Sequence, residues 1–207
     1  MIYRHIDGVQ VTATFSPCRQ YRYRLEITLN SPVAGNPVTV CAILQNPSAA
    51  NADIADKSVQ FLEKLVFIQG LPPFAGALRL IIVNQFAFIQ TKAFAGMDLH
   101  IGSENDKHIE QAIAEADVIL IAWGKSNPYT SRKQAIDRML TNQNHKLLLQ
   151  GKSHPSRASY NGYVSTYNVW QKLQTDGLRA ADWEKAEIRT FCRLSPVVSA
   201  LTQTRIW

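Results

Sequence analysis

The chain has 207 residues, of which 46% are hydrophobic and 18% charged, and its formal net charge is +6. This composition excludes a disordered chain, and the length suffices for one well-buried domain. Every apolar run is too short to cross a bilayer, and the first residues lack the apolar core of a signal peptide. We therefore expect a cytoplasmic protein without membrane contact, and the excess of basic charge adds some weight to a polyanionic partner.

The cysteines and histidines have no metal-ligand spacing. Three cysteines without a Cys-x-x-Cys pair support neither a disulfide framework nor a thiolate zinc or iron–sulfur site. The histidines also lack partners at such spacing, so we expect His100, His108 and His145 to face solvent. The sequence therefore predicts no metal and no cofactor.

The N-terminal part is predicted to form a hairpin. Residues 9–15 and 20–29 are predicted strands, and in the second strand basic and aromatic or apolar residues alternate. This alternation fits a phosphate-tracking and base-stacking strip. It also fits an amphipathic strand at a sheet edge with its arginines in water, which we favour. The residues concerned are Arg19, Arg22 and Arg24 with Tyr21 and Tyr23.

Beyond the hairpin, strand-like and helix-like segments alternate. The strands are predicted over residues 38–44, 78–84, 117–123 and 146–150. The helices are predicted over residues 56–69, 103–116, 131–140 and 166–174. Such alternation predicts an α/β fold with a mainly parallel, right-handed wound sheet.

Polar residues follow the predicted strands. Asn46 comes shortly after the strand over 38–44, Asn84 ends the next strand, and His154 follows the last. In open α/β sheets, ligands bind in the crevice outside the carboxyl ends of the strands. We therefore expect Asn46, Asn84 and His154 to converge on one pocket, although a strand-end Asn often only caps the following loop.

Four short motifs occur in a defined order. They are Gln45-Asn46-Pro47, Val83-Asn84, Ala122-Trp123-Gly124 and His154-Pro155-Ser156. They resemble the uracil-DNA glycosylase superfamily, in which a strand-end G-Q-D-P or G-x-N-P motif precedes a strand ending in Asn, a strand ending in Trp-Gly, and a late His-Pro-Ser loop. The resemblance spans roughly residues 38–183. It implies a three-layer αβα sandwich around a mainly parallel four-stranded sheet, with the N-terminal hairpin as an extension.

Within that superfamily, the chain looks closest to an uncharacterised bacterial and phage family with an N-P-S-x-A motif. The motif here begins at Asn46-Pro47-Ser48, and residues 102–106 add to the likeness. That family has no settled activity to transfer. We expect a single domain over residues 1–207, with a hairpin extension (1–37), a core (38–183) and a tail (184–207).

The resemblance implies a glycosylase-like hydrolase that cleaves the N-glycosidic bond of a nucleic-acid base or modified base. Asn46 would place the attacking water, Asn84 would read the base edge, and His154 would stabilise the departing base. An amide cannot accept a proton, so a carboxylate is needed if a base acts. Asp53 is the candidate, with Asp56 as the other choice, although helix capping explains both carboxylates.

The residues around these positions complete the predicted site. Phe86 could stack on a base or pack in the core, and Arg157 could contact phosphate or be an ordinary loop cation. The uracil enzymes have an aromatic residue or glycine where this chain has Ser48, and a leucine wedge where it has Arg157-Ala158. Loss of the wedge weakens the case for flipping a base out of a duplex. The predicted substrate contacts are Gln45, Pro47, Ser48, Asn84, Phe86, Ser156 and Arg157.

Two alternatives to hydrolysis stay open. A non-catalytic module of the same fold could bind a nucleobase, a nucleotide or an exposed single-stranded base. An inherited fold could also have an unrelated small-molecule role. The expected partner is nucleic acid, DNA before RNA, or a small molecule containing a nucleobase, and the sequence leaves the base and the oligomeric state open.

Overall fold

The computed structural model describes residues 3–33, 35–124, 126–143, 145–169 and 171–172. The chain divides into two compact units, residues 1–168 and 169–207. All elements named below belong to the first unit. The predicted tail over 184–207 and the last part of the predicted core, to residue 183, lie outside the described residues.

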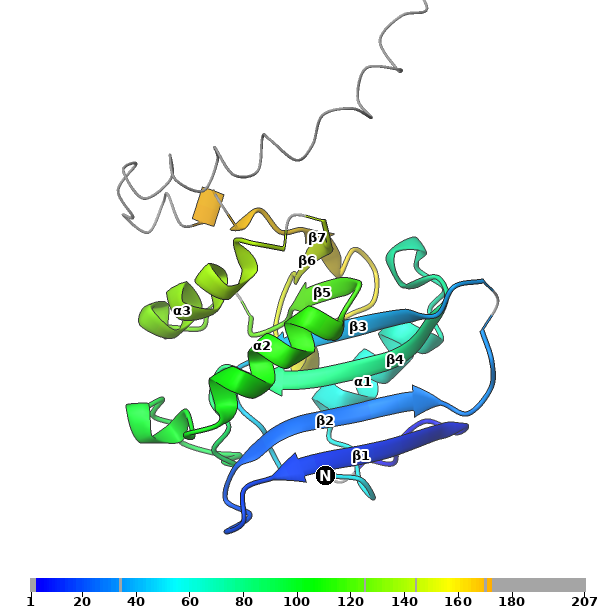
Figure 1. Ribbon diagram of the computed structural model, residues 1–207. Coiled ribbons are helices and arrows are strands. Elements are labelled where there is room, and N and C mark those ends of the chain that lie inside the picture. Colours follow the sequence, from blue (N-terminus) through cyan, green and yellow to red (C-terminus); the bar gives the residue numbers. More distant parts are fainter. Residues whose placement is uncertain (1–2, 34, 125, 144, 170, 173–207) are drawn as a thin grey trace, which may run out of the picture. The chain divides into compact units, whose positions relative to one another are not determined.

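Helices and strands follow one another as in Figure 1. The strands are β1 (Val9–Phe15), β2 (Arg22–Leu29), β3 (Val38–Leu44), β4 (Ala77–Asn84), β5 (Val118–Ile121), β6 (Leu147–Gly151) and β7 (Val164–Thr166). The α-helices are α1 (Lys57–Phe67), α2 (Asn105–Glu115) and α3 (Thr130–Leu140). Short 3-10 helices are η1 (Pro72–Phe74), η2 (Asp98–His100) and η3 (Pro155–Arg157).

The strands form one seven-stranded sheet in the order β1-β2-β4-β3-β5-β6-β7. β3 is parallel to β4 and β5, and β5 is parallel to β6, as the alternating pattern predicts. However, β2 joins β4 antiparallel, and β7 joins β6 antiparallel. The sheet is therefore mixed and wider than the predicted four strands. The predicted helix over 166–174 is wrong at its start, because Thr166 pairs with Leu149 in the sheet.

The N-terminal hairpin is confirmed, but its second strand is not an edge strand. β1 pairs with β2 from Val9 opposite Leu29 onward, and β2 is held between β1 and β4. The prediction that the arginines of this strand lie in water is wrong for Arg22 and Arg24, which are 2% and 7% exposed. Arg24 reaches the carboxylate of Glu115 at 2.7 Å because α2 packs over this part of the sheet.

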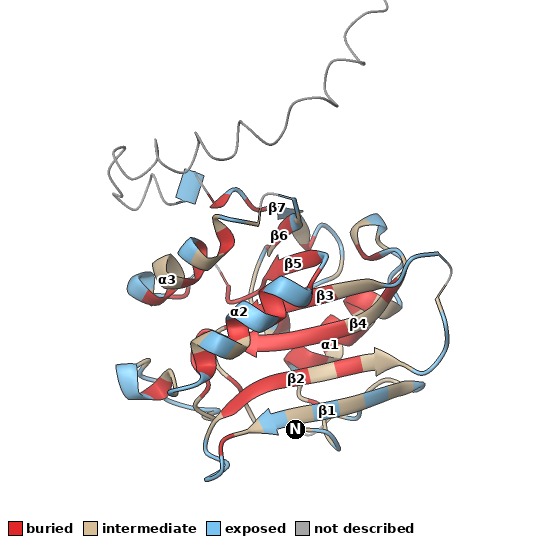
Figure 2. Ribbon diagram, viewed as in Figure 1, coloured by how far each residue is buried: buried red, intermediate tan, exposed pale blue. Residues whose placement is uncertain are grey.

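Helices cover both faces of the sheet, α1 on one side and α2 on the other (Figure 1). The buried strands between them form the core, seen as red in Figure 2. Asp56 begins α1 by accepting a hydrogen bond from the Val59 N–H at 2.8 Å, and Leu62 and Leu65 are fully buried. Burial of each such leucine contributes about 1.5–3 kcal/mol. Within the described ranges, no helix has the length and apolarity needed to cross a membrane.

The N-terminal residues hold the loop between β3 and α1. Tyr3 and Ala55 exchange backbone hydrogen bonds at 3.1 and 2.9 Å. His5 forms an ion pair with the buried carboxylate of Glu63 on α1, and its Nε2 lies 2.9 Å from the carbonyl oxygen of Asn51. This short segment therefore fixes the loop that carries Ser48 and Asp56.

Candidate functional site

The site lies where the carboxyl ends of β3, β4 and β5 meet. Leu44 at the end of β3 is opposite Asn84 at the end of β4, and Ile43 is opposite Ile121 of β5. β4 and β5 lie on opposite sides of β3, so the direction of winding reverses at β3. Such reversals open the crevice in which α/β proteins bind ligands. Asn46 and Asn84 both lie at this edge.

His154 is held against the end of β5 by a close approach to Gly124. The φ angle of Gly124 is +86°, and a Cβ built on this residue would lie 3.2 Å from the backbone nitrogen of His154. Glycine adopts this left-handed conformation without strain, whereas the Cβ of any other residue would also press on His154. The Trp-Gly and His-Pro-Ser motifs, roughly thirty residues apart in the sequence, are therefore packed together at the end of β5.

Ser156 determines which nitrogen of His154 carries the proton. The Ser156 N–H donates to Nδ1 of His154 at 3.3 Å, and Ser156 Oγ lies 2.9 Å from the same atom. A backbone N–H can only donate, so Nδ1 is the acceptor and the neutral ring carries its proton on Nε2. Burial lowers the pKa of His154, Arg157 lowers it further, and Asp56 opposes the shift. His154 is therefore a neutral hydrogen-bond donor at neutral pH, and its Nε2 has no hydrogen-bond partner in the described part of the chain.

A series of hydrogen bonds between amides, here called the amide relay, orients Asn46. The Tyr129 N–H donates to Asn127 Oδ1 at 3.1 Å, and Asn127 Nδ2 donates to Gln45 Oε1 at 3.3 Å. Gln45 Nε2 then donates to Asn46 Oδ1 at 3.3 Å, and Asn46 Nδ2 donates to the Gln90 carbonyl at 2.6 Å. Because the relay begins at a backbone donor, each amide has one allowed orientation. Asn46 Oδ1 keeps one lone pair for a further hydrogen.

Asn84 is in contact with the buried Arg22. Asn84 is 1% exposed, and its Oδ1 accepts a hydrogen bond from Arg22 Nη2 at 3.3 Å. Arg22 Nη1 donates to the carbonyl oxygen of Ala50 at 2.7 Å. Asn84 Nδ2 and Arg22 Nε are buried, and neither has a hydrogen-bond partner within the part of the chain that the structure describes. Burial lowers the pKa of Arg22 to about 10, while the charge of Asp56 opposes this shift.

The structure brings Asp56 to the site and leaves Asp53 outside it. The Ser48 hydroxyl donates to Asp56 Oδ2, and the charge of Asp56 acts on both Arg22 and His154. Asp53 is exposed in a turn, where its backbone N–H donates to Asn51 Oδ1 at 2.8 Å. Of the two carboxylates considered from the sequence, Asp56 is thus the one that the loop directs toward the strand ends.

The other predicted substrate contacts have different environments. Phe86 is 2% exposed and packs edge-on against Phe94 and Tyr129, with ring centroids 5.1 and 4.9 Å apart. Phe86 also lines a cavity of about 370 Å³ beside the first turn of α3. Pro47 is buried, whereas Arg157 is exposed at the end of η3. Arg157 is therefore free to reach a ligand, and Phe86 is held in an aromatic cluster.

Sequence reasoning missed the buried polar residues that orient the motif side chains. These residues are Arg22, Gln85, Asn105 and Asn127. Asn105 at the start of α2 donates to the carbonyl oxygen of Asn84 at 3.0 Å, and Asn127 donates to Gln85 Oε1 at 2.5 Å. The only sign of these residues in the sequence was the position of Gln85 directly after Asn84. For the others, burial arises from pairing between distant segments, which local sequence does not encode.

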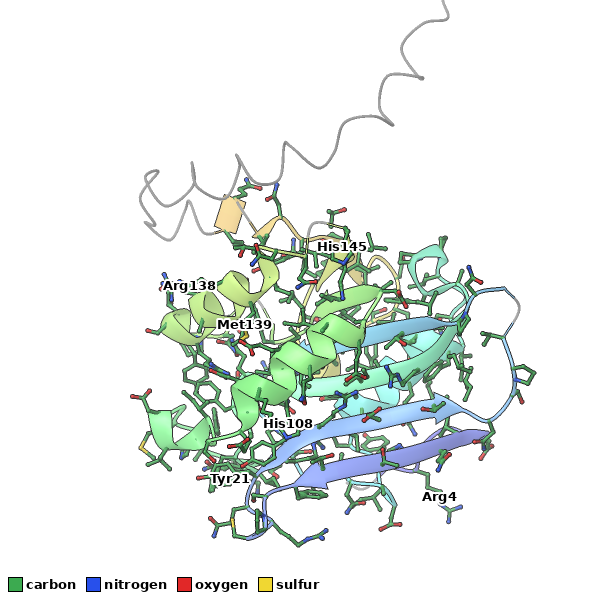
Figure 3. The ribbon with its side chains drawn as sticks, viewed as in Figure 1. Arg4, Tyr21, His108, Arg138, Met139 and His145 are labelled. Carbon is green, nitrogen blue, oxygen red and sulfur yellow. The ribbon has the colours of Figure 1, made fainter. Side chains whose placement is uncertain are left out.

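Two of the remaining histidines are not simply solvent-facing. His100 is 5% exposed and stacks on Phe88 at 4.8 Å, so its predicted exposure is wrong because an aromatic cluster encloses it. His108, labelled on α2 in Figure 3, is partly buried. Its ring stacks on Tyr23 of β2, with the ring centroids 5.0 Å apart. His145 is exposed, as predicted. Among the described residues, no group of three or more His, Cys, Asp or Glu could hold a metal ion.

Comparison with known families gives one match. A family model described as "Protein of unknown function (DUF1643)" matches residues 22–157, which is more than half of the chain. The chain belongs to this family. The matched segment runs from Arg22 at the start of β2 to Arg157 at the end of η3, and it includes Asn46, Asn84 and His154. No curated protein and no solved structure matches the chain. A domain of unknown function is thus confirmed, and the likeness to the uracil-DNA glycosylase superfamily stays a prediction.

Proposed function

We propose that the protein is a glycosylase-like hydrolase that cleaves the N-glycosidic bond of a nucleic-acid base or modified base, with the fold of the uracil-DNA glycosylase superfamily. The observation that carries this proposal is the fixed tautomer of His154. Its Nδ1 accepts a hydrogen bond from the Ser156 N–H, and the neutral ring carries Nε2–H close to Gly124, which follows β5. A neutral donor suits a base carbonyl oxygen that gains negative charge as the base departs.

In the proposed reaction, the bond between C1′ of the sugar and the ring nitrogen of the base breaks, and its electron pair leaves with the base. The oxygen of a water molecule bonds to C1′, and the proton that the water releases finally neutralises the departed base. His154 Nε2–H stabilises the negative charge between these two events. A well-placed donor of this kind contributes about 3–4 kcal/mol to stabilisation of the transition state.

Asn46 and Asp56 would act on the water. The amide relay fixes Asn46 with Nδ2 on the Gln90 carbonyl and Oδ1 available to a hydrogen of water. An amide cannot take the proton. Asp56, whose charge already acts on His154, is the carboxylate that we assign to this role in place of Asp53.

The test is a strand-cleavage assay after alkaline treatment. Single- and double-stranded DNA would carry uracil, mismatched thymine, hypoxanthine or a hypermodified pyrimidine. We expect abasic sites with the wild type and none with Asn46→Ala or His154→Ala. Substitutions of the exposed residues His145 and Asn142 to Ala are the matched controls and should leave cleavage unchanged. The absence of product from every substrate would refute hydrolysis.

A second candidate function is a non-catalytic module that binds a nucleobase or exposed single-stranded DNA. The hydrogen bonds that Asp56 already makes favour this binding module. Its Oδ1 accepts from the Val59 N–H, and its Oδ2 accepts from the Ser48 hydroxyl. Both carboxylate oxygens are therefore already engaged within the protein, which leaves Asp56 less available to contact a water molecule. A binding module predicts salt-dependent binding of oligonucleotides without abasic product, because phosphate contacts release counterions.

A further inference from the structure

Arg22 determines how Asn84 can contact a ligand. A guanidinium has five N–H donors and no acceptor, so the Asn84 atom that lies 3.3 Å from Arg22 Nη2 must be the carbonyl oxygen Oδ1. The amide nitrogen Nδ2 therefore points away from Arg22. An isolated Asn could offer either face of its amide to a base, but Asn84 offers its donor.

Among the described residues, the polar atoms of Arg22 and Asn84 that lack a partner are donors, while the neighbouring Asn105 leaves one acceptor, Oδ1, unpaired. Asn84 Nδ2 and Arg22 Nε make no hydrogen bond to any described residue, although the two residues are only 1% and 2% exposed. Buried donors are normally satisfied, and leaving one unpaired costs free energy. Arg22 and Asn84 therefore offer N–H donors at this position, and Nε2–H of His154 is a further donor.

The charge of Arg22 strengthens this preference. No carboxylate accepts a hydrogen bond from its guanidinium among the described residues, since its two terminal nitrogens donate to the oxygens of Ala50 and Asn84. Asp56 acts on it only through its charge. A buried cation with a free N–H attracts acceptor atoms and disfavours a neighbouring N–H of a ligand.

We propose that Arg22 sets the specificity of the site by fixing Asn84 as a donor, so that the site selects a base with two adjacent acceptor atoms on one edge. This inference rests on the proposed function of the same site. The O6 and N7 atoms of a 6-oxopurine form such an edge, and so do the O2 and N3 atoms of cytosine. Uracil and thymine do not, because their N3–H donor lies between two carbonyl oxygens. The site therefore discriminates against uracil.

The experiment measures binding to short oligonucleotides in which a single base is set among abasic spacers. The base would be hypoxanthine, cytosine or uracil, on a 2′-fluoro sugar that resists cleavage. We expect the wild type to bind hypoxanthine or cytosine at least about tenfold more tightly than uracil. The reason is that a ligand which leaves buried polar groups of a site unpaired binds more weakly. Arg22→Met, which frees Asn84 Oδ1, should move this ratio toward uracil.

Two further variants control the result. Arg24→Met removes a buried arginine that pairs with Glu115 and has no hydrogen bond to Asn84, so it should leave the ratio unchanged. Asn84→Asp keeps an acceptor for Arg22 but removes the Nδ2 donor, and it should weaken binding of hypoxanthine and cytosine. This variant also provides the test if Arg22→Met does not fold, as judged from its urea unfolding curve.

The outcomes separate this inference from the proposed function. A wild type that prefers uracil, or a ratio that neither Arg22→Met nor Asn84→Asp changes, overturns the specificity role of Arg22 even if cleavage occurs. The expected ratio without cleavage of any natural substrate supports the role of Arg22 and replaces hydrolysis with binding. The absence of binding to all three bases overturns the specificity role of Arg22, and the strand-cleavage assay then decides hydrolysis by itself.

Discussion

Both ring nitrogens of His5 face acceptors. Nδ1 is paired with the carboxylate of Glu63, and Nε2 lies 2.9 Å from the carbonyl oxygen of Asn51. Since both partners accept, each nitrogen must carry a hydrogen, and His5 is an imidazolium in the folded protein. Burial alone would lower its pKa, but the hydrogen bonds to Glu63 and Asn51 outweigh burial and raise it.

We expect this pair to make stability depend on pH. The folded pKa of His5 is above its unfolded value, so the contribution is complete below about pH 6.5 and is lost as the pH rises through the folded pKa. Urea unfolding of the wild type and His5→Gln at about pH 5.5 and about pH 8.5 measures this effect. The wild type should exceed the variant by more at the lower pH. A difference that grows with pH would contradict the pairing.

His154 should show the opposite dependence on pH. Burial lowers its pKa, so the ring stays neutral in the folded protein until the pH falls below about 6.5. Stability is then lost as the pH falls from the unfolded to the folded pKa, because the unfolded chain takes up the proton first.

Nitrogen-15 NMR of the His154 imidazole should detect the Nε2–H tautomer at neutral pH. A Nδ1–H signal would overturn the assignment, and Ser156→Ala should weaken the tautomer preference.

Gly124→Ala should destabilise the fold more than Gly162→Ala. Both glycines have left-handed backbones, with φ angles of +86° and +59°. That conformation costs an alanine about 1–2 kcal/mol at either position. Only at Gly124 would the new Cβ also press on the backbone of His154, whereas it would meet nothing within 4 Å at Gly162. Urea unfolding of the two variants measures the difference, and equal losses would refute the close approach to His154.

Asn127→Asp should interrupt the amide relay. The new carboxylate cannot donate, so it would face Gln45 Oε1 and Gln85 Oε1 with oxygens where the Asn127 Nδ2 now donates. We expect a loss of about 1–3 kcal/mol, the cost of buried acceptors left unpaired. The exposed Asn142→Asp is the control and should change stability little. A midpoint of urea unfolding equal to that of the wild type would indicate that the relay contributes no stability.

Cys18 should react with iodoacetamide in the folded protein and Cys41 should not. The hydrogen bond from Ser16, at 3.3 Å, and another from the backbone of Gln20 lower the pKa of the exposed Cys18 thiol. Burial raises the pKa of Cys41 to about 12. Peptide mass spectrometry after brief labelling would identify the modified residue. Ser16→Ala should slow the labelling of Cys18, and equal labelling of both thiols would contradict the packing around Cys41.

The sequence predicts strands well where local preference and burial agree. The run from Val38 to Leu44 is apolar and rich in β-branched residues, and the predicted and observed bounds of β3 coincide. β7 was missed because its three residues, Val164–Thr166, are mostly exposed and are held by pairing with β6 rather than by an apolar pattern. Tertiary pairing decides such short edge strands.

The residues of the candidate site also differ in how far the sequence predicts their positions. Asn46, Asn84 and His154 could be placed at strand ends because parallel strands end at one edge of a sheet. The choice between Asp53 and Asp56 could not be made, because it depends on how the loop before α1 folds against Ser48. The burial of Arg22 could not be predicted from the sequence either, because it depends on the pairing of β2 with β4, which places β2 inside the sheet and not at its edge.

The position of β2 between β1 and β4 gives the N-terminal hairpin a role beyond widening the sheet. A shortened chain that began at β3 would retain each of the four motifs, yet it would lack Arg22. Asn84 would then be free to turn its amide. In the function that we propose, the strands from β3 onward supply the chemistry, whereas the first thirty residues, roughly, decide which base receives it.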